Sequence, residues 1–123
     1  MFMVYTNEWY SFDKIIRVIM KYMVDIDGTI CYTVNSNYEE SRPYKDRIEH
    51  LNGLYEAGNE IHYYTARGSV SGNDWQEFTV RQLMSWGVKA TTIKTGKKQY
   101  DIWIDDKAIS DTEYFKQQGI SRG

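Results

Sequence analysis

Short apolar, β-forming runs alternate with segments of helical spacing from residue 21 onward. Period and composition predict strands at four places, which are residues 21–27, 60–64, 89–94 and 101–104. Residues 28–41 mix β-forming side chains with Asn and Ser, which suggests a loop or a small hairpin. Residues 66–74 are rich in Gly and Ser and predict a loop.

Apolar residues at helical spacing predict two longer helices between these strands. The first opens near Ser41 and Pro43, because Ser can cap a helix and Pro is tolerated in the first turn, and it stops at Gly58. The second covers residues 75–86 and stops at Gly87, since glycine commonly follows the last helical turn. Each helix therefore connects two expected strands.

A short last helix and the strand order complete the expected fold. Ser110 precedes Glu113 by the spacing of a capping box, so a helix is expected to begin there. Strand–helix alternation with short links predicts an α/β fold, a Rossmann-like three-layer sandwich around a parallel sheet. Right-handed crossovers and a shared ligand site favour the strand order 4-1-2-3, numbering the expected strands along the chain.

Composition describes one ordinary folded domain and excludes several classes of protein. The 17 acidic and 15 basic side chains leave a net charge of −2, which argues against nucleic-acid binding through a basic surface. Cys31 is the only cysteine, so the sequence excludes an intrachain disulfide and a Cys-rich zinc site and favours a reducing, cytoplasmic setting. Arg17 and Lys21 interrupt the apolar run at residues 15–24, so no membrane association is expected.

Asp25 and Asp27 lie at the end of the first expected strand and are followed by Gly28. Residues two apart in a strand face the same side, and glycine allows a sharp bend, so both carboxylates can point toward one ligand. One can attack phosphorus while the other protonates the leaving oxygen and later activates water. Two other interpretations stay open at this point: a simple Asp-Gly turn, or a calcium loop, although Ser36 stands where the EF-hand pattern requires Glu.

Phosphate-binding groups follow the second and third expected strands. Thr65 ends the second strand, where its hydroxyl and the backbone N–H groups of Ala66 and Arg67 can cradle a phosphate. Lys97 follows the third strand and can neutralise charge on phosphoryl oxygens. Taken singly, each has a structural alternative, because Thr is a common strand residue and Lys97 with Lys98 can be a solvated turn pair.

Asp105 and Asp106 follow the fourth expected strand. Adjacent acids repel one another unless a cation or solvent relieves the repulsion. Mg²⁺ is usually held by one or two carboxylates plus phosphate oxygens and waters, so Asp25 and Asp105 are sufficient. The alternative for this pair taken alone is a solvated acidic turn. Because ligands of parallel α/β sheets bind outside the carboxyl ends of the strands, the whole set can meet at one point.

In this order, Asp-x-Asp-Gly-Thr, Thr, Lys and Asp-Asp on successive strands resemble the four motifs of the haloacid dehalogenase-like (HAD) phosphatases. The resemblance spans residues 20–110 and includes the segments 64–68, 74–88 and 101–108. These segments are similar to small HAD proteins without a cap domain, described as capsule or lipopolysaccharide biosynthesis phosphatases in bacteria and phages. The resemblance implies an HAD-like catalytic domain over residues 20–123, with residues 1–19 as an extension of unassigned role.

The resemblance also implies roles for single residues. Asp25 would be the nucleophile, Asp27 the acid and base, and Thr65 and Lys97 the phosphate-binding side chains. Such relatives usually have Lys-Pro where this chain has Lys97-Lys98, so Lys98 is the alternative phosphate-binding lysine.

The implied cofactor is Mg²⁺, held by a side-chain oxygen of Asp25, the backbone carbonyl of Asp27 and Asp105, with Asp106 nearby. The expected function is a Mg²⁺-dependent phosphomonoester hydrolase that acts through an aspartyl-phosphate, on a sugar phosphate or related small metabolite of polysaccharide biosynthesis. The alternatives are a nucleic-acid end phosphatase of the same superfamily and a non-catalytic phosphate-binding or receiver-like module. Because the loops at residues 28–41 and 66–74 are too short for a cap, the resemblance implies an open site, used by a bulky substrate or covered in a homo-oligomer.

Overall fold

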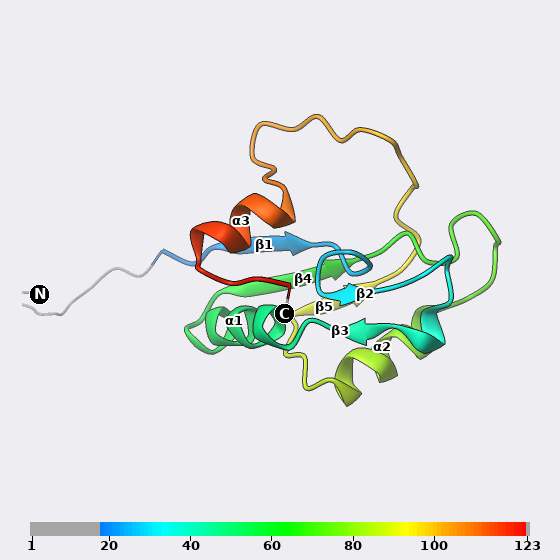
Figure 1. Cartoon of the computed structure of the whole chain (residues 1–123), viewed down its shortest axis with the longest axis horizontal. Helices are drawn as coiled ribbons and strands as arrows, with labels where there is room; N and C mark the ends of the chain where they lie inside the picture. Colours follow the sequence, from blue (N-terminus) through cyan, green and yellow to red (C-terminus); the bar gives the residue numbers. More distant parts are fainter. Residues whose placement is uncertain (1–17, 123) are drawn as a thin grey trace, which may run out of the picture.

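The computed structural model describes residues 18–122 of the chain (Figure 1). The expected extension over residues 1–19 therefore lies outside the described residues, except for its last two positions. No helix in residues 18–122 combines the length and the apolar character that crossing a membrane requires.

Three parallel strands form the main sheet in the order β1-β4-β5. They are β1 (Lys21–Val24), β4 (Glu60–Tyr64) and β5 (Thr92–Lys94). Val24 pairs with Tyr63, which pairs in turn with Ile93, so all three strands end at the same edge of the sheet. Strands therefore form at the first three predicted places, although β1 and β5 are shorter than the predicted ranges.

Each helix follows the apolar periodicity of its segment. The helices are α1 (Lys45–Glu56), α2 (Gln76–Ser85) and α3 (Asp111–Gln117). The helix predicted to begin at Ser110 is confirmed at α3, where the Ser110 hydroxyl accepts the Glu113 backbone N–H at 3.2 Å. The predicted Ser41 cap of α1 is wrong, because the helix begins after Tyr44, whose N–H bonds the Ile30 carbonyl instead.

A small hairpin occupies the segment between β1 and α1. Strand β2 (Cys31–Tyr32) pairs antiparallel with β3 (Arg42–Pro43), and the 3-10 helix η1 (Tyr38–Glu40) lies between them. The hairpin that the mixed composition of residues 28–41 suggested is therefore present. It places η1 beside α2, on one flank of the sheet (Figure 1).

The hydrophobic core lies against one face of the sheet. Its buried members come from β4, the segment around β2 and all three helices: Ile26, Ile30, Cys31, Ile48, Leu51, Ile61, Tyr63, Leu83 and Phe115. On the opposite face Met23 is 68% exposed. The described residues therefore form one helical layer on the sheet, and the third layer of the predicted sandwich is not formed by them.

The structure differs from the prediction at the fourth strand. Residues 101–104 make no strand pairing and lie in a long loop that runs from β5 to α3 (Figure 1), with Ile102 77% and Ile104 93% exposed. Only residues 95–100 separate β5 from this segment, whereas a parallel crossover takes about a dozen residues or more. The described sheet therefore lacks the strand numbered 4 in the predicted order 4-1-2-3, and contains strands at the places numbered 1, 2 and 3.

Gly68 lies in the loop between β4 and α2, at a position with no room for a side chain. Its φ is +80°, and a Cβ built there would overlap the carbonyl oxygen of Asn73 and press on the Trp75 ring. Gly72 has nearly the same φ, +79°, but a Cβ there meets nothing within 4 Å. Both Gly→Ala changes carry the backbone strain of a left-handed residue, and only Gly68→Ala adds a clash.

We expect Gly68→Ala to lower the free energy of unfolding by about 1–3 kcal/mol more than Gly72→Ala, the usual cost of overpacking. Urea denaturation of the two variants beside the wild type measures this difference. Equal losses would show that the loop relaxes away from the clash.

Candidate functional site at the carboxyl ends of the strands

Asp25 and Lys97 meet where β1 and β5 end. The Lys97 Nζ donates to Asp25 Oδ1 at 3.0 Å, with the lysine side chain 11% exposed and the aspartate side chain 40% exposed. The Lys97 backbone N–H also bonds the Thr65 carbonyl at 2.9 Å, which ties the lysine to the end of β4. Lys98 is exposed. Of the two candidate lysines, the structure therefore places Lys97 beside the half-exposed carboxylate.

Asp27 lies two residues further on and is held by Arg67. The guanidinium donates from Nε to Oδ2 and from Nη2 to Oδ1, both at 2.9 Å, in a bidentate pair. Gly28, with φ +87°, turns the chain immediately after Asp27 and brings the Gly28 N–H to the Cys31 carbonyl at 2.8 Å. This turn places the Asp27 carboxylate across from the end of β4.

The Arg67 side chain is fully buried and has partners on three other elements. Its Nη1 donates to Thr79 Oγ1 at 3.2 Å and to Gln82 Oε1 at 2.8 Å, both on α2. Its planar head lies over the Tyr38 ring of η1, 4.6 Å from the ring centre. A buried cation is costly unless it is paired and hydrogen-bonded, and this set of partners meets both conditions.

Three further donors surround the Asp27 carboxylate. Thr33 Oγ1 donates to Oδ1 at 2.6 Å, Cys31 Sγ to Oδ1 at 3.5 Å and Thr65 Oγ1 to Oδ2 at 3.5 Å. Burial raises the pKa of Asp27, but the hydrogen bonds from Arg67 and Thr33 and the charge of Arg67 outweigh it, so the net pKa lies below its ordinary value. Asp27 is accordingly an ionised hydrogen-bond acceptor at neutral pH.

Thr65 and the backbone beyond it are part of this same network. Thr65 is buried, and its Oγ1 accepts the Arg67 backbone N–H at 3.2 Å. The predicted phosphate cradle from the N–H groups of Ala66 and Arg67 is therefore only partly available, because the Arg67 N–H already bonds a hydroxyl. Thr65 lies between the Asp27–Arg67 pair and Lys97, whose N–H its carbonyl accepts.

Asp105 and Asp106 are not brought to this site. Asp105 accepts the Lys107 backbone N–H at 2.7 Å and the Trp103 indole N–H at 3.3 Å, which lower its pKa in that order. Asp106 faces the Lys107 Nζ at 3.4 Å. These contacts are local to the loop between β5 and α3, so the four predicted metal ligands are not gathered. In residues 18–122, no three acidic, histidine or cysteine side chains lie together as a ready metal site.

Sequence reasoning missed the side-chain role of Arg67. The sequence patterns predicted this residue only as a backbone N–H donor, whereas its side chain pairs with a carboxylate 40 positions earlier. The available signal was the polar pair Thr79 and Gln82, which sits three residues apart within the otherwise apolar face of the second helix. Because buried polar side chains are almost always hydrogen-bonded, such a pair predicts a polar partner elsewhere in the chain.

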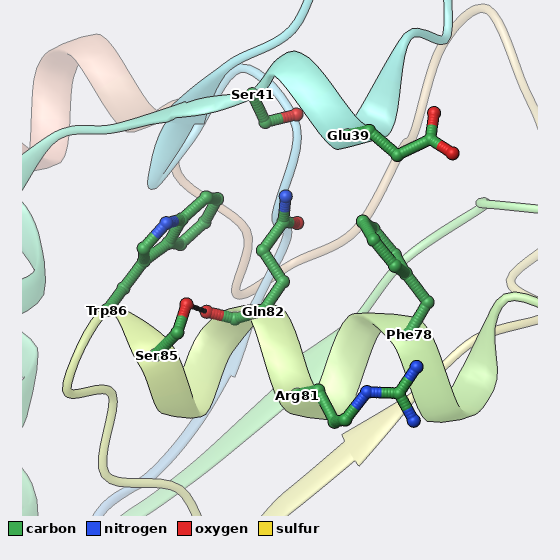
Figure 2. Close-up of a pocket in the computed structure, with 7 residues that line it drawn as sticks. All are labelled: Glu39, Ser41, Phe78, Arg81, Gln82, Ser85 and Trp86. Atoms are coloured by element: carbon green, nitrogen blue, oxygen red, sulfur yellow. Dashed lines mark hydrogen bonds between the residues drawn. The ribbon is translucent and has the colours of Figure 1, made fainter.

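A groove of about 400 Å³ lies between η1 and α2 and is lined in part by Gln82, one of the hydrogen-bond partners of Arg67. Figure 2 shows Phe78, Gln82 and Trp86 along one side of α2, facing Ser41 and Glu39. Its central amide is already engaged, because Gln82 Nε2 donates to the Tyr38 carbonyl at 2.7 Å while Oε1 accepts from Arg67. The Gln82 amide in this groove therefore helps to hold Arg67 in place.

Comparison with known proteins gives a fold relative. The chain is similar to a crystal structure of a target protein from Vibrio cholerae, at 27% sequence identity and a TM-score of 0.70. The match covers 78% of this chain and 87% of the other, and the name of that protein states no function. No family model matches the chain. No curated protein matches it either. The α/β architecture is thus shared with a solved protein.

The second prediction compares a buried arginine, Arg67, with an exposed one, Arg81. Arg67→Met leaves the Asp27 carboxylate without its main partner, and breaking a buried pair typically costs about 3–5 kcal/mol. Arg81→Met removes an arginine whose pair with Glu77 at 2.9 Å is exposed on both sides, and such pairs contribute about 0.5 kcal/mol or less.

Urea unfolding at neutral pH measures both losses. A small loss for Arg67→Met, similar to that for Arg81→Met, would contradict the view that the Asp27–Arg67 pair organises this edge of the sheet.

Proposed function

We propose that this protein is a Mg²⁺-dependent phosphomonoester hydrolase of the HAD type, acting through an aspartyl-phosphate on Asp25. The observation that carries the proposal is the Asp25–Lys97 contact of 3.0 Å at the carboxyl edge of a parallel sheet. A carboxylate that is partly exposed and faces a nearly buried ammonium has an oxygen free for attack and a cation in place for an oxyanion. The order of the sequence motifs supports the same assignment.

The proposed reaction has two halves. In the first, an Asp25 oxygen forms a bond to phosphorus while the bond to the leaving oxygen breaks, and Lys97 neutralises charge on the phosphoryl oxygens. In the second, a water oxygen bonds to phosphorus, the Asp25 oxygen leaves, and Asp27 accepts a proton from that water. Asp27 is ionised at neutral pH, as a group that accepts this proton must be. Because Asp27 starts ionised, the leaving oxygen departs as an anion and takes its proton from solvent, and Asp27 later returns the proton from the attacking water to solvent. Any proton transfer at Asp27 requires its pair with Arg67 to loosen.

The side chains at this edge fit part of a Mg²⁺ site. Mg²⁺ prefers oxygen ligands and usually binds one or two carboxylates together with phosphate oxygens and waters. The Asp25 carboxylate and the backbone carbonyl of Asp27 would hold it, and Asp105 would join them only if the loop between β5 and α3 moved toward β1. When bound, the ion would supply positive charge to the phosphoryl oxygens.

A small phosphorylated metabolite, such as a sugar phosphate, is the proposed substrate class. The loops at residues 28–41 and 66–74 add no domain above the Asp25–Lys97 pair, which leaves this edge of the sheet accessible. A bulky substrate, or a second copy of the chain, would then limit the access of water.

The third prediction tests the nucleophile. Asp25→Asn should abolish hydrolysis of p-nitrophenyl phosphate in the presence of Mg²⁺, because an amide oxygen is a poor nucleophile and a weaker metal ligand. Asp46→Asn, an exposed change in the first turn of α1, serves as the matched control and should retain activity. EDTA should remove the wild-type activity. Full activity of purified Asp25→Asn would reject covalent catalysis at this position.

The fourth prediction concerns Lys97. Lys97→Ala should weaken vanadate inhibition and slow turnover by about tenfold or more, since losing a hydrogen bond to a charged group costs about 1.5–3 kcal/mol. Lys94→Ala removes an exposed lysine at the end of β5 and should leave both quantities near the wild-type values. Steady-state kinetics and vanadate titration measure these effects. Unchanged vanadate inhibition in Lys97→Ala would assign the oxyanion-binding group elsewhere.

A further inference from the structure

A second groove is lined in part by the residues on either side of Lys97 in the chain. It has a volume of about 390 Å³ and lies between two loops, one following β4 and one following β5. Its lining residues are Ser69, Val70, Gly96, Lys98 and Gln99. Neither the proposed chemistry nor the Arg67 network uses any of these side chains.

The backbone joins this groove to the proposed phosphoryl site. The Thr65 N–H bonds the Lys94 carbonyl at 3.0 Å and the Lys97 N–H bonds the Thr65 carbonyl at 2.9 Å, so the two loops leave the sheet side by side. Gly96 and Lys98 flank Lys97 in the chain. A molecule whose phosphoryl group sits against Lys97 therefore has this groove as an immediate place for its remainder.

The loop that follows β4 forms one wall of this groove, and its own backbone hydrogen bonds hold its conformation. The Ser69 N–H bonds the Ala66 carbonyl and the Gly72 N–H bonds the Gly68 carbonyl, both at 2.9 Å. Gly68 also packs against Asn73 so tightly that no side chain fits there. A wall held by these contacts loses little conformational entropy when a ligand binds.

The charge of the groove indicates its ligand. Its lining offers one ammonium from Lys98, a hydroxyl and an amide, and no carboxylate. Within residues 18–122 the Lys98 ammonium forms no ion pair, whereas Lys97 beside it is paired with Asp25. A cation free of protein partners, in a groove next to an anion-binding site, favours a ligand with a second negative group.

We infer that this groove binds the part of the substrate that is not transferred, and that Lys98 selects substrates carrying a second acidic group, either a carboxylate or a second phosphate. This inference rests on the proposed function for the position of the first phosphate. It divides the two adjacent lysines between two tasks. Lys97 faces the reacting phosphoryl group, and Lys98 faces the remainder of the molecule.

Binding measurements without turnover test this selectivity. Calorimetry with Asp25→Asn protein compares two matched ligand pairs: glycerol 3-phosphate with 3-phosphoglycerate, and fructose 6-phosphate with fructose 1,6-bisphosphate. In at least one pair we expect the member with the second acidic group to bind about tenfold more tightly, the typical effect of one charged hydrogen bond. The pair that shows the preference tells whether Lys98 selects a carboxylate or a phosphate.

A second substitution in the same protein identifies the residue responsible. Lys98→Gln should remove the preference, whereas Lys116→Gln, on the exposed side of α3, changes the net charge equally and should keep it. Equal binding within both pairs, or a preference that survives Lys98→Gln, would overturn the inference.

Turnover of p-nitrophenyl phosphate by the wild type separates this inference from the proposed function. Turnover without a Lys98-dependent preference would overturn the inference alone. A Lys98-dependent preference without turnover would support the groove as an anion-selective site and overturn the assignment as a hydrolase.

Discussion

The ion pair between Asp27 and the fully buried Arg67 is the interaction on which this edge of the molecule depends. A buried guanidinium must satisfy its donors within the protein, and here they reach the end of β1 and the buried face of α2, while its flat side rests on η1. One side chain thereby fixes the relative positions of three segments that are distant in sequence. The Thr33, Cys31 and Thr65 donors then complete the Asp27 shell, and burial raises the pKa of the Cys31 thiol to about 11, which keeps that group inert.

Two carboxylates that lie two residues apart consequently have opposite environments. Asp27 is enclosed by donors and kept ionised, whereas Asp25 is partly exposed and has a single cation, Lys97, beside it. Donors around an enclosed carboxylate hold it in place and keep it ionised, whereas an open carboxylate is available as a nucleophile. This difference in environment, set largely by Arg67 and Lys97, is the physical basis of the proposed division of roles.

Local sequence patterns predicted the parts of the fold that local physics determines. Strands β1, β4 and β5 and all three helices carry their own periodicity or capping signals, so they could be recognised one at a time. The segment 101–104 has the composition of a strand, but its connection from β5 is short, and Trp103 contacts Tyr100 and Asp105 within the loop. The pairing of Asp27 with Arg67 could not be predicted for a different reason, because these residues lie 40 positions apart and are brought together by the pairing of β1 with β4.

The account rests on Asp25 as the group that becomes phosphorylated, and chemical trapping tests this most directly. The protein is mixed with p-nitrophenyl phosphate and Mg²⁺, quenched and reduced with borohydride, which converts an aspartyl-phosphate to homoserine, and its peptides are analysed by mass spectrometry. The account predicts homoserine at position 25, dependent on substrate and absent in Asp25→Asn. Turnover with an unmodified Asp25, or with the modification at another carboxylate, would contradict it.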